Sequence, residues 1–219
     1  LGFSPKSLYI GGQWQDSIDG GIFETINPSN REKLGDVPDA TEKDIDRAVT
    51  ATRSAFEEWR RVPIAERARC LEKLAQRIDD HAEELALMDA VDAGNALSGM
   101  RGDMEWTAKT LRYFAGLITE IKGESSSHGP RHLNITRRQP YGVVAKINPF
   151  NHPFRFCAEK AAAPLAAGNC VVIKGSEQAP LSSLKLGELC EGIFPKGVVN
   201  IVTGDAKAGA ALVNHPDVS

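Results

Sequence analysis

The chain opens with short runs in which apolar and polar residues alternate between pairs of glycines. The apolar positions are Leu8, Ile10, Trp14, Ile22, Phe23 and Ile26. A period of two is typical of half-buried strands, and Gly11-Gly12 and Gly20-Gly21 supply turns between them. Asn27-Pro28 marks the next turn, so we predict a set of short strands at the start of the chain.

From residue 41 the apolar residues recur every three or four positions, which is the period of an amphipathic helix. Thr41 followed by Asp44 resembles a capping box, so a first helix begins there and ends before Pro63. A second begins near Pro63 and ends at Gly94, and a third covers residues 104–121. The stripes, each predicted to pack into the core, are Ile45, Ala48, Val49, Thr52, Phe56 and Trp59; Leu71, Leu74, Ala75, Ile78, Ala82 and Leu85; and Trp106, Leu111, Phe114, Leu117 and Ile118.

The composition changes between residues 123 and 139 to Gly, Ser, His, Arg and Asn. Leu133 and Ile135 alternate there with polar neighbours, which predicts a solvent-exposed two-stranded arm. We therefore divide the chain into residues 1–122, whose strands and helices pack on the rest, the arm at 123–139, and a third part at 140–219.

Strands and helices alternate after Pro140. We predict strands at 141–147, 169–174 and 198–202, with helices at 153–167 and 180–190 between them. This order predicts an α/β fold with a Rossmann-like parallel sheet buried on both faces. Ligands bind such sheets beyond the carboxyl ends of the strands, so three loops become candidate sites.

Composition and charge exclude several classes of protein. The 219 residues are 42% hydrophobic and 25% charged, as in a globular protein. A formal net charge of -3 leaves no basic surface of the kind that nucleic acids or anionic membranes require. No apolar stretch reaches the about 20 residues of a membrane helix, and no signal peptide is recognisable. We expect a cytoplasmic protein without nucleic-acid or membrane partners.

The four cysteines are Cys70, Cys157, Cys170 and Cys190. They show no C-x-x-C pair and no clustering with histidine, so we expect neither a metal site nor a disulfide framework. Cys157 follows His152 closely, which suggests a Cys/His pair, but it falls in a helix-prone stretch where an inert buried thiol is the better interpretation. We assign no nucleophile.

The first strand-end loop is Asn148-Pro149-Phe150-Asn151-His152-Pro153. Its two prolines make it stiff, and the glycine fingerprint of dinucleotide sites is absent. One interpretation is a rigid connection with Asn151 as a helix cap. The other is that the Asn151 amide donates to a developing oxyanion.

The second loop is Lys174-Gly175-Ser176-Glu177. An acidic residue at this place in a dinucleotide fold accepts hydrogen bonds from ribose hydroxyls, and its charge would oppose the additional phosphate of NADP. Lys174 could bind the same ribose or a phosphate. The alternative is an exposed ion pair without a ligand.

The third loop, residues 204–209, precedes a helix of small residues. Gly204 and Gly209 permit close backbone approach, and the free N–H groups of the helix N-terminus suit a pyrophosphate. A plain glycine turn explains the same residues.

The segments PYGVVAKINPFNHP, LAAGNCVVIKGSEQAPLS and FPKGVVNIVTG resemble the cofactor-binding half of the NAD(P)-dependent aldehyde dehydrogenase superfamily, in that order. Upstream, VPDATEKDIDRAVTATRSAFEEW and ERARCLEKLAQRIDDHAEELA are similar to its N-terminal helices. The resemblance covers essentially the whole chain. It implies NAD-dependent oxidation of an aldehyde to a carboxylic acid by way of a cysteine thiohemiacetal and a thioester.

The resemblance also implies individual residues. Asn151 would be the catalytic oxyanion donor, and NAD, with NADP less favoured, would contact Ile147, Asn148, Pro149, Phe150, Lys174, Gly175, Ser176, Glu177, Gly204 and Gly209. The arm would join subunits into a homodimer or homotetramer. The chain departs from the family at Phe150, where many relatives have Trp, and at Asp92-Ala93-Gly94-Asn95, where Glu-Thr-Gly-Lys is usual.

By the same resemblance, the nucleophilic cysteine and the general-base glutamate belong to sequence beyond Ser219. We therefore expect these residues to be a fragment that is inactive alone, with three strands of a larger sheet and an uncovered edge on the last of them. The alternatives are a non-catalytic nucleotide-binding or assembly module of the same fold, and a relative that forms glutamate semialdehyde or acyl-CoA.

Overall fold

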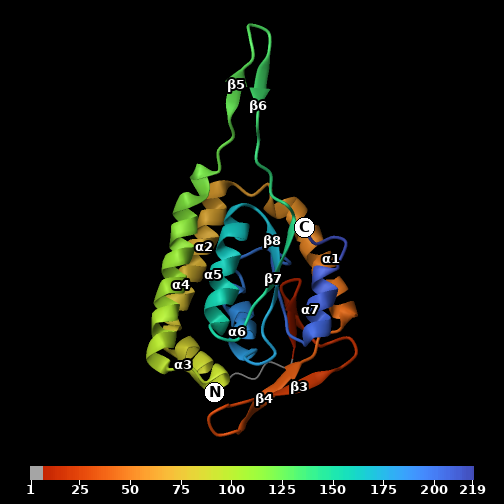
Figure 1. Ribbon diagram of the computed structural model, residues 1–219, viewed down its shortest axis with the longest axis vertical. Helices are drawn as coiled ribbons and strands as arrows, with labels where there is room; N and C mark the ends of the chain where they lie inside the picture. Colours follow the sequence, from red (N-terminus) through yellow and green to blue (C-terminus); the bar gives the residue numbers. More distant parts are fainter. Residues whose placement is uncertain (1–6) are drawn as a thin grey trace.

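A five-stranded sheet lies at the centre of the computed structural model, which describes residues 7–219 (Figure 1). Its spatial order is β2 (Gln13–Gln15), β1 (Leu8–Ile10), β9 (Val199–Val202), β8 (Cys170–Lys174) and β7 (Val143–Ile147). The last three strands are parallel to one another, as predicted from the alternation of strands and helices.

The N-terminal strands extend this sheet. β1 pairs antiparallel with β9, with Tyr9 opposite Ile201, and β2 pairs with β1. The expectation that the last strand would have an uncovered edge is therefore wrong. Hydrophobic alternation predicts a strand from local sequence, whereas the partner of that strand is set by contacts between residues that are far apart in the chain.

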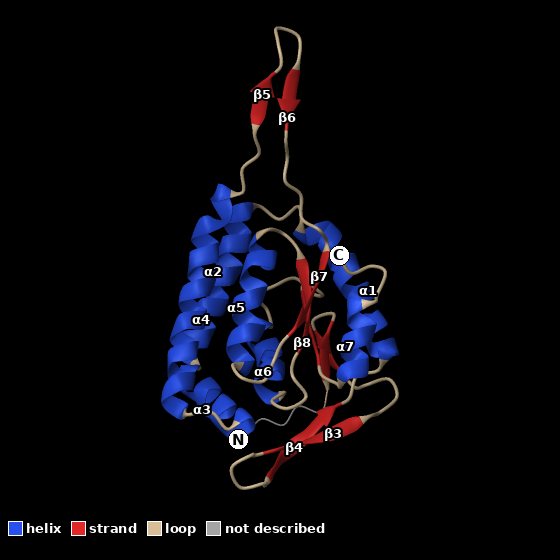
Figure 2. Ribbon diagram, in the orientation of Figure 1, coloured by secondary structure: helices blue, strands red, loops and turns tan. Residues whose placement is uncertain are grey.

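Helices cover both faces of the sheet (Figure 2). α5 (Pro153–Ala166) and α6 (Leu181–Cys190) pack on one face, and α1 (Glu42–Trp59) and α7 (Ala206–Val213) pack on the other. Val171 and Ile173 of β8 enter one apolar cluster and Val172 enters the other, because neighbouring residues of a strand point to opposite faces. Every residue of β8 is buried, which confirms the predicted burial on both faces.

The first predicted helix has the expected start. Asp44 accepts a hydrogen bond from the backbone N–H of Thr41 at 2.9 Å, so the capping box is confirmed at the beginning of α1. The helix ends at Trp59, four residues before Pro63.

The single helix predicted between Pro63 and Gly94 is wrong. The structure has α2 (Ile64–Asp80) and α3 (Ala82–Ala93), separated by His81, whose φ of -110° and ψ of 12° are not helical. One non-helical residue leaves the three-to-four-residue apolar period nearly unchanged, so the pattern does not reveal the break. The break directs α3 toward the N-terminal ends of α5 and α6.

The third helix also differs from the prediction. α4 (Leu97–Leu117) starts seven residues earlier than expected and continues into a short 3₁₀ turn, η1 (Ile118–Glu120). Trp106 and Leu117 are 54% and 38% exposed, so these two stripe residues are not core. The buried side of α4 comprises Met100, Asp103, Met104, Thr107, Ala108, Leu111 and Ala115.

Two hairpins lie at opposite ends of the molecule (Figure 1). β3 (Ile22–Ile26) and β4 (Lys33–Pro38) form one beside α3, and β5 (Ser125–Ser127) and β6 (Leu133–Ile135) form an arm that stands away from the body. The two-stranded arm is confirmed. The division into parts at 1–122, 123–139 and 140–219 stays a prediction, and residues 1–6 lie outside the described residues.

Candidate functional site

The carboxyl ends of the three parallel strands lie side by side. Ile147 is in register with Lys174, and Lys174 with Val202. The ladder continues into the loops, because the N–H of Asn148 donates to the carbonyl of Lys174 at 3.1 Å and that of Gly175 to Val202 at 3.2 Å. The loops selected from the sequence therefore start at one common edge.

The first loop has an inward and an outward part. Asn148 is buried, and its Nδ2 donates to the Sγ of Cys157 at 3.4 Å, so this side chain ties the loop to α5. Pro149 is exposed, and Ile147 and Phe150 are 46% and 50% exposed. These three side chains are available to a ligand at the sheet edge.

Asn151 is exposed and does not cap α5. The N-cap is His152, without a side-chain cap bond, so the interpretation of Asn151 as a helix cap is wrong. Its backbone carbonyl accepts a hydrogen bond from Nδ2 of Asn95 at 3.0 Å. Within residues 7–219 its side-chain amide has no hydrogen-bond partner, which leaves the donor free.

The second loop contains an ion pair of unequal burial. Lys174 is 3% exposed, and its Nζ donates to the carbonyl of Gly175 and to Oε2 of Glu177, both at 3.2 Å. The Glu177 side chain is 47% exposed. The alternative of an exposed ion pair therefore describes only the carboxylate of Glu177. This carboxylate keeps enough exposed surface to contact a second partner.

The two residues between them shape the loop. A Cβ at Gly175 would overlap the Oγ of Ser183, so only glycine lets this backbone lie against α6. Ser176 is buried, and its Oγ accepts a hydrogen bond from the N–H of Gln178 at 3.2 Å. Ser176 thus holds the turn that presents Glu177.

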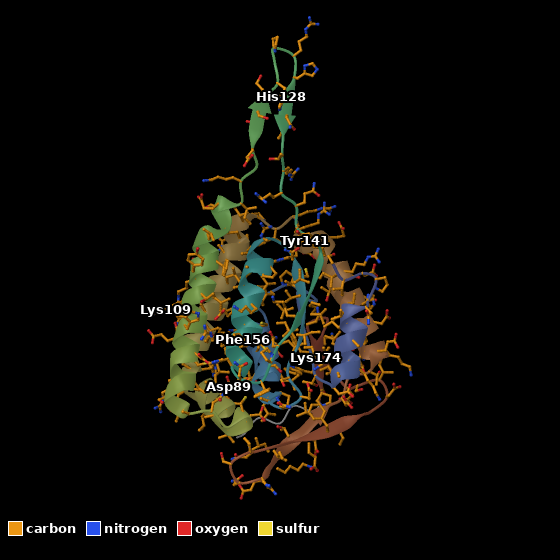
Figure 3. All side chains as sticks on the ribbon, in the orientation of Figure 1. Asp89, Lys109, His128, Tyr141, Phe156 and Lys174 are labelled. Atoms are coloured by element: carbon orange, nitrogen blue, oxygen red, sulfur yellow. The ribbon has the colours of Figure 1, made fainter. Side chains whose placement is uncertain are left out.

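The third loop is shorter than predicted. Asp205 caps α7, which begins at Ala206, so Gly209 lies inside the helix. Oδ1 of Asp205 accepts from the N–H of Lys207 at 2.7 Å, so one of the N–H groups expected to be free for a pyrophosphate is occupied. A Cβ at Gly209 would lie 3.7 Å from the side chain of Lys174, which Figure 3 shows beside α7.

Gly204 serves a packing need. Its φ of 140° is a conformation that side chains disfavour, and a Cβ there would lie 2.9 Å from that of Ala208 and 3.1 Å from the carbonyl of Ala40. Glycine at this position lets the end of β9 pass closely between α7 and the segment before α1.

A cleft of about 370 Å³ joins the first two loops. It is lined by Glu24, Thr25, Ile26, Pro28, Asp92, Ala93, Phe150, Glu177 and Gln178. The structure therefore brings Phe150 and Glu177, predicted from separate loops, to one concave surface. The other walls come from the β3–β4 hairpin and the end of α3, which the sequence interpretation did not assign to the site.

Two buried carboxylates of α3 support these loops. Oδ2 of Asp89 accepts from the N–H of Phe154 at 3.1 Å, and Oδ2 of Asp92 accepts from the N–H of Leu181 at 2.9 Å. Burial raises the pKa of Asp89 to about 7 and that of Asp92 to about 6. Figure 3 shows Asp89 on α3. Acidic residues on the apolar side of a helix were the available signal in the sequence.

None of the four cysteines is an activated thiol. Burial raises the pKa of Cys170 and Cys190 to about 12, and burial also raises the pKa of Cys157 and Cys70. A nucleophilic cysteine needs the opposite shift, so these shifts indicate no candidate nucleophile among the four.

In residues 7–219 no helix combines the length and the apolar character needed to cross a bilayer. The same residues contain no group of three or more His, Cys, Asp or Glu side chains that could hold a metal ion.

Comparison with known proteins gives one consistent result. A sequence model described as the aldehyde dehydrogenase family matches residues 14–219. Aldehyde dehydrogenase tropH of Talaromyces stipitatus is 44% identical over 95% of this chain and 41% of its own length. An NAD+ complex of aldehyde dehydrogenase from Bacillus cereus superimposes with a TM-score of 0.95 at 42% identity, over 98% of this chain and 45% of that one.

A 3,6-anhydro-L-galactose dehydrogenase in complex with NAP superimposes with a TM-score of 0.93 at 32% identity, over 97% of this chain and 45% of that one. The chain thus spans less than half the length of these relatives. The family model, the strand-end loops and the fold all indicate the same family, and together they cover nearly all of the described residues. The chain belongs to the aldehyde dehydrogenase family.

Proposed function

We propose that these residues form the cofactor-binding part of an enzyme that oxidises an aldehyde to a carboxylic acid with NAD. The observation that carries the proposal is the common strand-end edge, where the unpartnered amide of Asn151 and the half-exposed carboxylate of Glu177 follow adjacent parallel strands. The Bacillus cereus relative, solved as an NAD+ complex, supports the choice of cofactor.

The residues present fit a dinucleotide. Glu177 can accept hydrogen bonds from ribose hydroxyls, and Gly175 keeps the adjacent backbone flat against α6. Phe150 provides an apolar wall in the same cleft. When bound, NAD would accept a hydride from the substrate. Glu177 favours NAD over NADP, because a second negative group beside the carboxylate would be repelled.

Asn151 would act on the substrate oxygen. Asn95 donates a hydrogen bond to the backbone carbonyl of Asn151, and Asn148 ties the start of the loop to α5 through Cys157. The side-chain amide of Asn151 is exposed and has no hydrogen-bond partner among residues 7–219. A positioned N–H donor stabilises the oxyanion that forms when a nucleophile attacks a carbonyl. Because burial raises the pKa of all four cysteines of this chain, the proposal requires a nucleophile from outside these 219 residues.

Two further proposals concern the assembly of the protein, which rests on the arm, and its cellular compartment, which rests on the thiols. Leu133 and Ile135 are each 67% exposed on β6, which suits pairing with another subunit in a homodimer or homotetramer. All four cysteines are free, which is typical of a reducing compartment such as the cytoplasm.

The test uses a polypeptide in which this chain is continued to the length of its relatives, here called the full-length form. Asn151→Ala should lower kcat about 10²-fold to 10³-fold and leave the Kd for NAD within about twofold, since the amide acts on the oxyanion alone. Asn134→Ala, at an exposed position of the arm, is the matched control. Equal kcat in both variants would contradict the role of Asn151. A wild-type form that binds NAD without oxidising any aldehyde would favour the non-catalytic module.

A further inference from the structure

The C-terminal half of α3 contacts both strand-end loops of the proposed site. Asp89 and Asp92 are three residues apart, so their side chains leave the helix on neighbouring positions of one side. Each is buried, with 0% and 1% of its surface exposed, and each carboxylate accepts a backbone N–H from the first turn of a different helix.

Asp89 holds the start of α5. Phe154 is the second residue of that helix, and its N–H has no partner within the helix because it belongs to the first turn. The acceptor is Oδ2 of Asp89, and the loop with Asn151 ends at the preceding residues. A shift of Phe154 would therefore move Asn151.

Asp92 holds the start of α6 in the same way. Oδ2 accepts from the N–H of Leu181, the first residue of α6, and Oδ1 accepts from the hydroxyl of Thr25 at 2.5 Å. The loop with Glu177 ends at Leu181, and Thr25 and Glu177 line the same cleft. Asp92 thus joins the β3–β4 hairpin to the second loop.

We propose that Asp89 and Asp92 are positioning residues with separate effects: Asp89 sets the position of Asn151 through Phe154, and Asp92 sets the position of Glu177 through Leu181. The inference rests on the proposed function of the two loops. It gives the acidic residue of the departing Asp92-Ala93-Gly94-Asn95 segment a specific contact.

Replacing either aspartate with asparagine removes its charge but keeps a hydrogen-bond acceptor, so the two properties can be tested separately. Asn at position 89 retains an acceptor for Phe154 and keeps a polar group beside the hydroxyl of Ser182, which interacts with the carboxyl of Asp89. Asn at position 92 retains an acceptor for Leu181, and its amide can donate to Thr25. The amides therefore preserve the contacts, whereas alanine removes them.

The experiment measures kcat and the KM for NAD in the full-length form, at a temperature where circular dichroism shows every variant folded. Asp89→Ala should lower kcat about tenfold or more with the KM for NAD within about twofold. Asp92→Ala should raise that KM about tenfold with kcat within about threefold. Asp89→Asn and Asp92→Asn should both restore wild-type values. Glu83→Gln, an exposed position of the same helix, is the control.

Amide hydrogen exchange gives a readout that does not depend on activity. Asp89→Ala should increase exchange at Phe154 and leave Leu181 protected, and Asp92→Ala should do the reverse. Parallel losses of kcat and affinity in both alanine variants, or no rescue by the amides, would overturn the proposal. If the two alanine variants show these selective changes in exchange but the wild-type full-length form does not bind NAD, the positioning contacts are supported and the proposed function is contradicted.

Discussion

Lys174 and Glu177 form an ion pair across the second strand-end loop, with Nζ of the lysine 3.2 Å from Oε2 of the glutamate. The ammonium is buried and also bonds to the carbonyl of Gly175, whereas the carboxylate is half exposed. The buried partner fixes the direction of the exposed one. Glu177 therefore enters the cleft as an oriented acceptor.

Glu177→Gln should weaken NAD binding by the full-length form about tenfold. The neutral amide is a weaker acceptor for ribose hydroxyls, since a hydrogen bond to a charged group contributes about 1.5 kcal/mol or more. The ratio of NADP to NAD affinity should rise, because the repulsion of a phosphate is removed. Calorimetric titration with both cofactors measures this, with Glu57→Gln on α1 as the control. Tighter binding of NADP than NAD by the wild type would contradict the argument.

Gly175→Ala should lower the free energy of unfolding by about 1–3 kcal/mol, the usual cost of overpacking. The added Cβ would lie 2.7 Å from the Cβ of Ser183, so removing the hydroxyl alone is insufficient, and Gly175→Ala should cost much less when it is made in a Ser183→Gly background than in the wild type. Urea unfolding measures both changes.

The control for Gly175 is Gly116→Ala. A Cβ at Gly116 meets no atom within 4 Å, and alanine is the better helix former, so this variant should gain about 0.5–1 kcal/mol. A similar loss at both glycines would show that close packing against α6 is not the cause.

Burial of Asp89 predicts a pH dependence of stability with a definite sign. Its pKa is raised from 3.8 to about 7, so the folded chain binds more protons than the unfolded chain between those values. Stability should therefore increase as the pH falls from 8 toward 4, by at most about 1.4 kcal/mol per pH unit for this group.

Asp89→Asn isolates that contribution because the amide does not titrate. The stability of the variant relative to the wild type should be greatest at pH 8 and should decline as the pH is lowered to 5. Urea unfolding at pH 5, 6.5 and 8 measures the difference. A difference independent of pH would mean that Asp89 does not titrate in this range.

The arm predicts an effect on assembly. Leu133→Ser with Ile135→Ser should shift the full-length form toward monomers, because the two exposed apolar side chains project from the same face of β6. Sedimentation velocity measures the change. Asn134→Ser, at the intervening position on the opposite face, should leave the assembly unchanged. Oligomers that persist in the double variant would exclude these side chains as the contact.

The buried thiols predict slow alkylation. Cys157 and Cys190 should react with iodoacetamide at pH 8 at least about tenfold more slowly in the folded chain than in urea, since their pKa values are raised by burial. Cys70, which is partly exposed, should react first. Mass spectrometry of timed digests identifies the sites. Rapid alkylation of Cys157 would reopen the Cys/His interpretation.

The local sequence pattern predicted most helices and strands, because each of them forms from residues that are close together in the chain. The capping box at Thr41, the strand–helix alternation after Pro140 and the arm agree with the structure. The break at His81 was missed because one irregular residue scarcely disturbs the apolar period. Trp106 has the spacing of a core residue and is exposed, since spacing does not say which side of a helix meets another element.

The sequence by itself determined the family, the alternation of strands and helices after Pro140, and the residues that follow the parallel strands. Only the tertiary structure decided that β1 covers the edge of β9, and that Asp89 and Asp92 join α3 to the starts of α5 and α6. The reason is physical: periodicity and capping are read over a few residues, whereas strand partners and buried hydrogen bonds join residues that are brought together only when the whole chain packs.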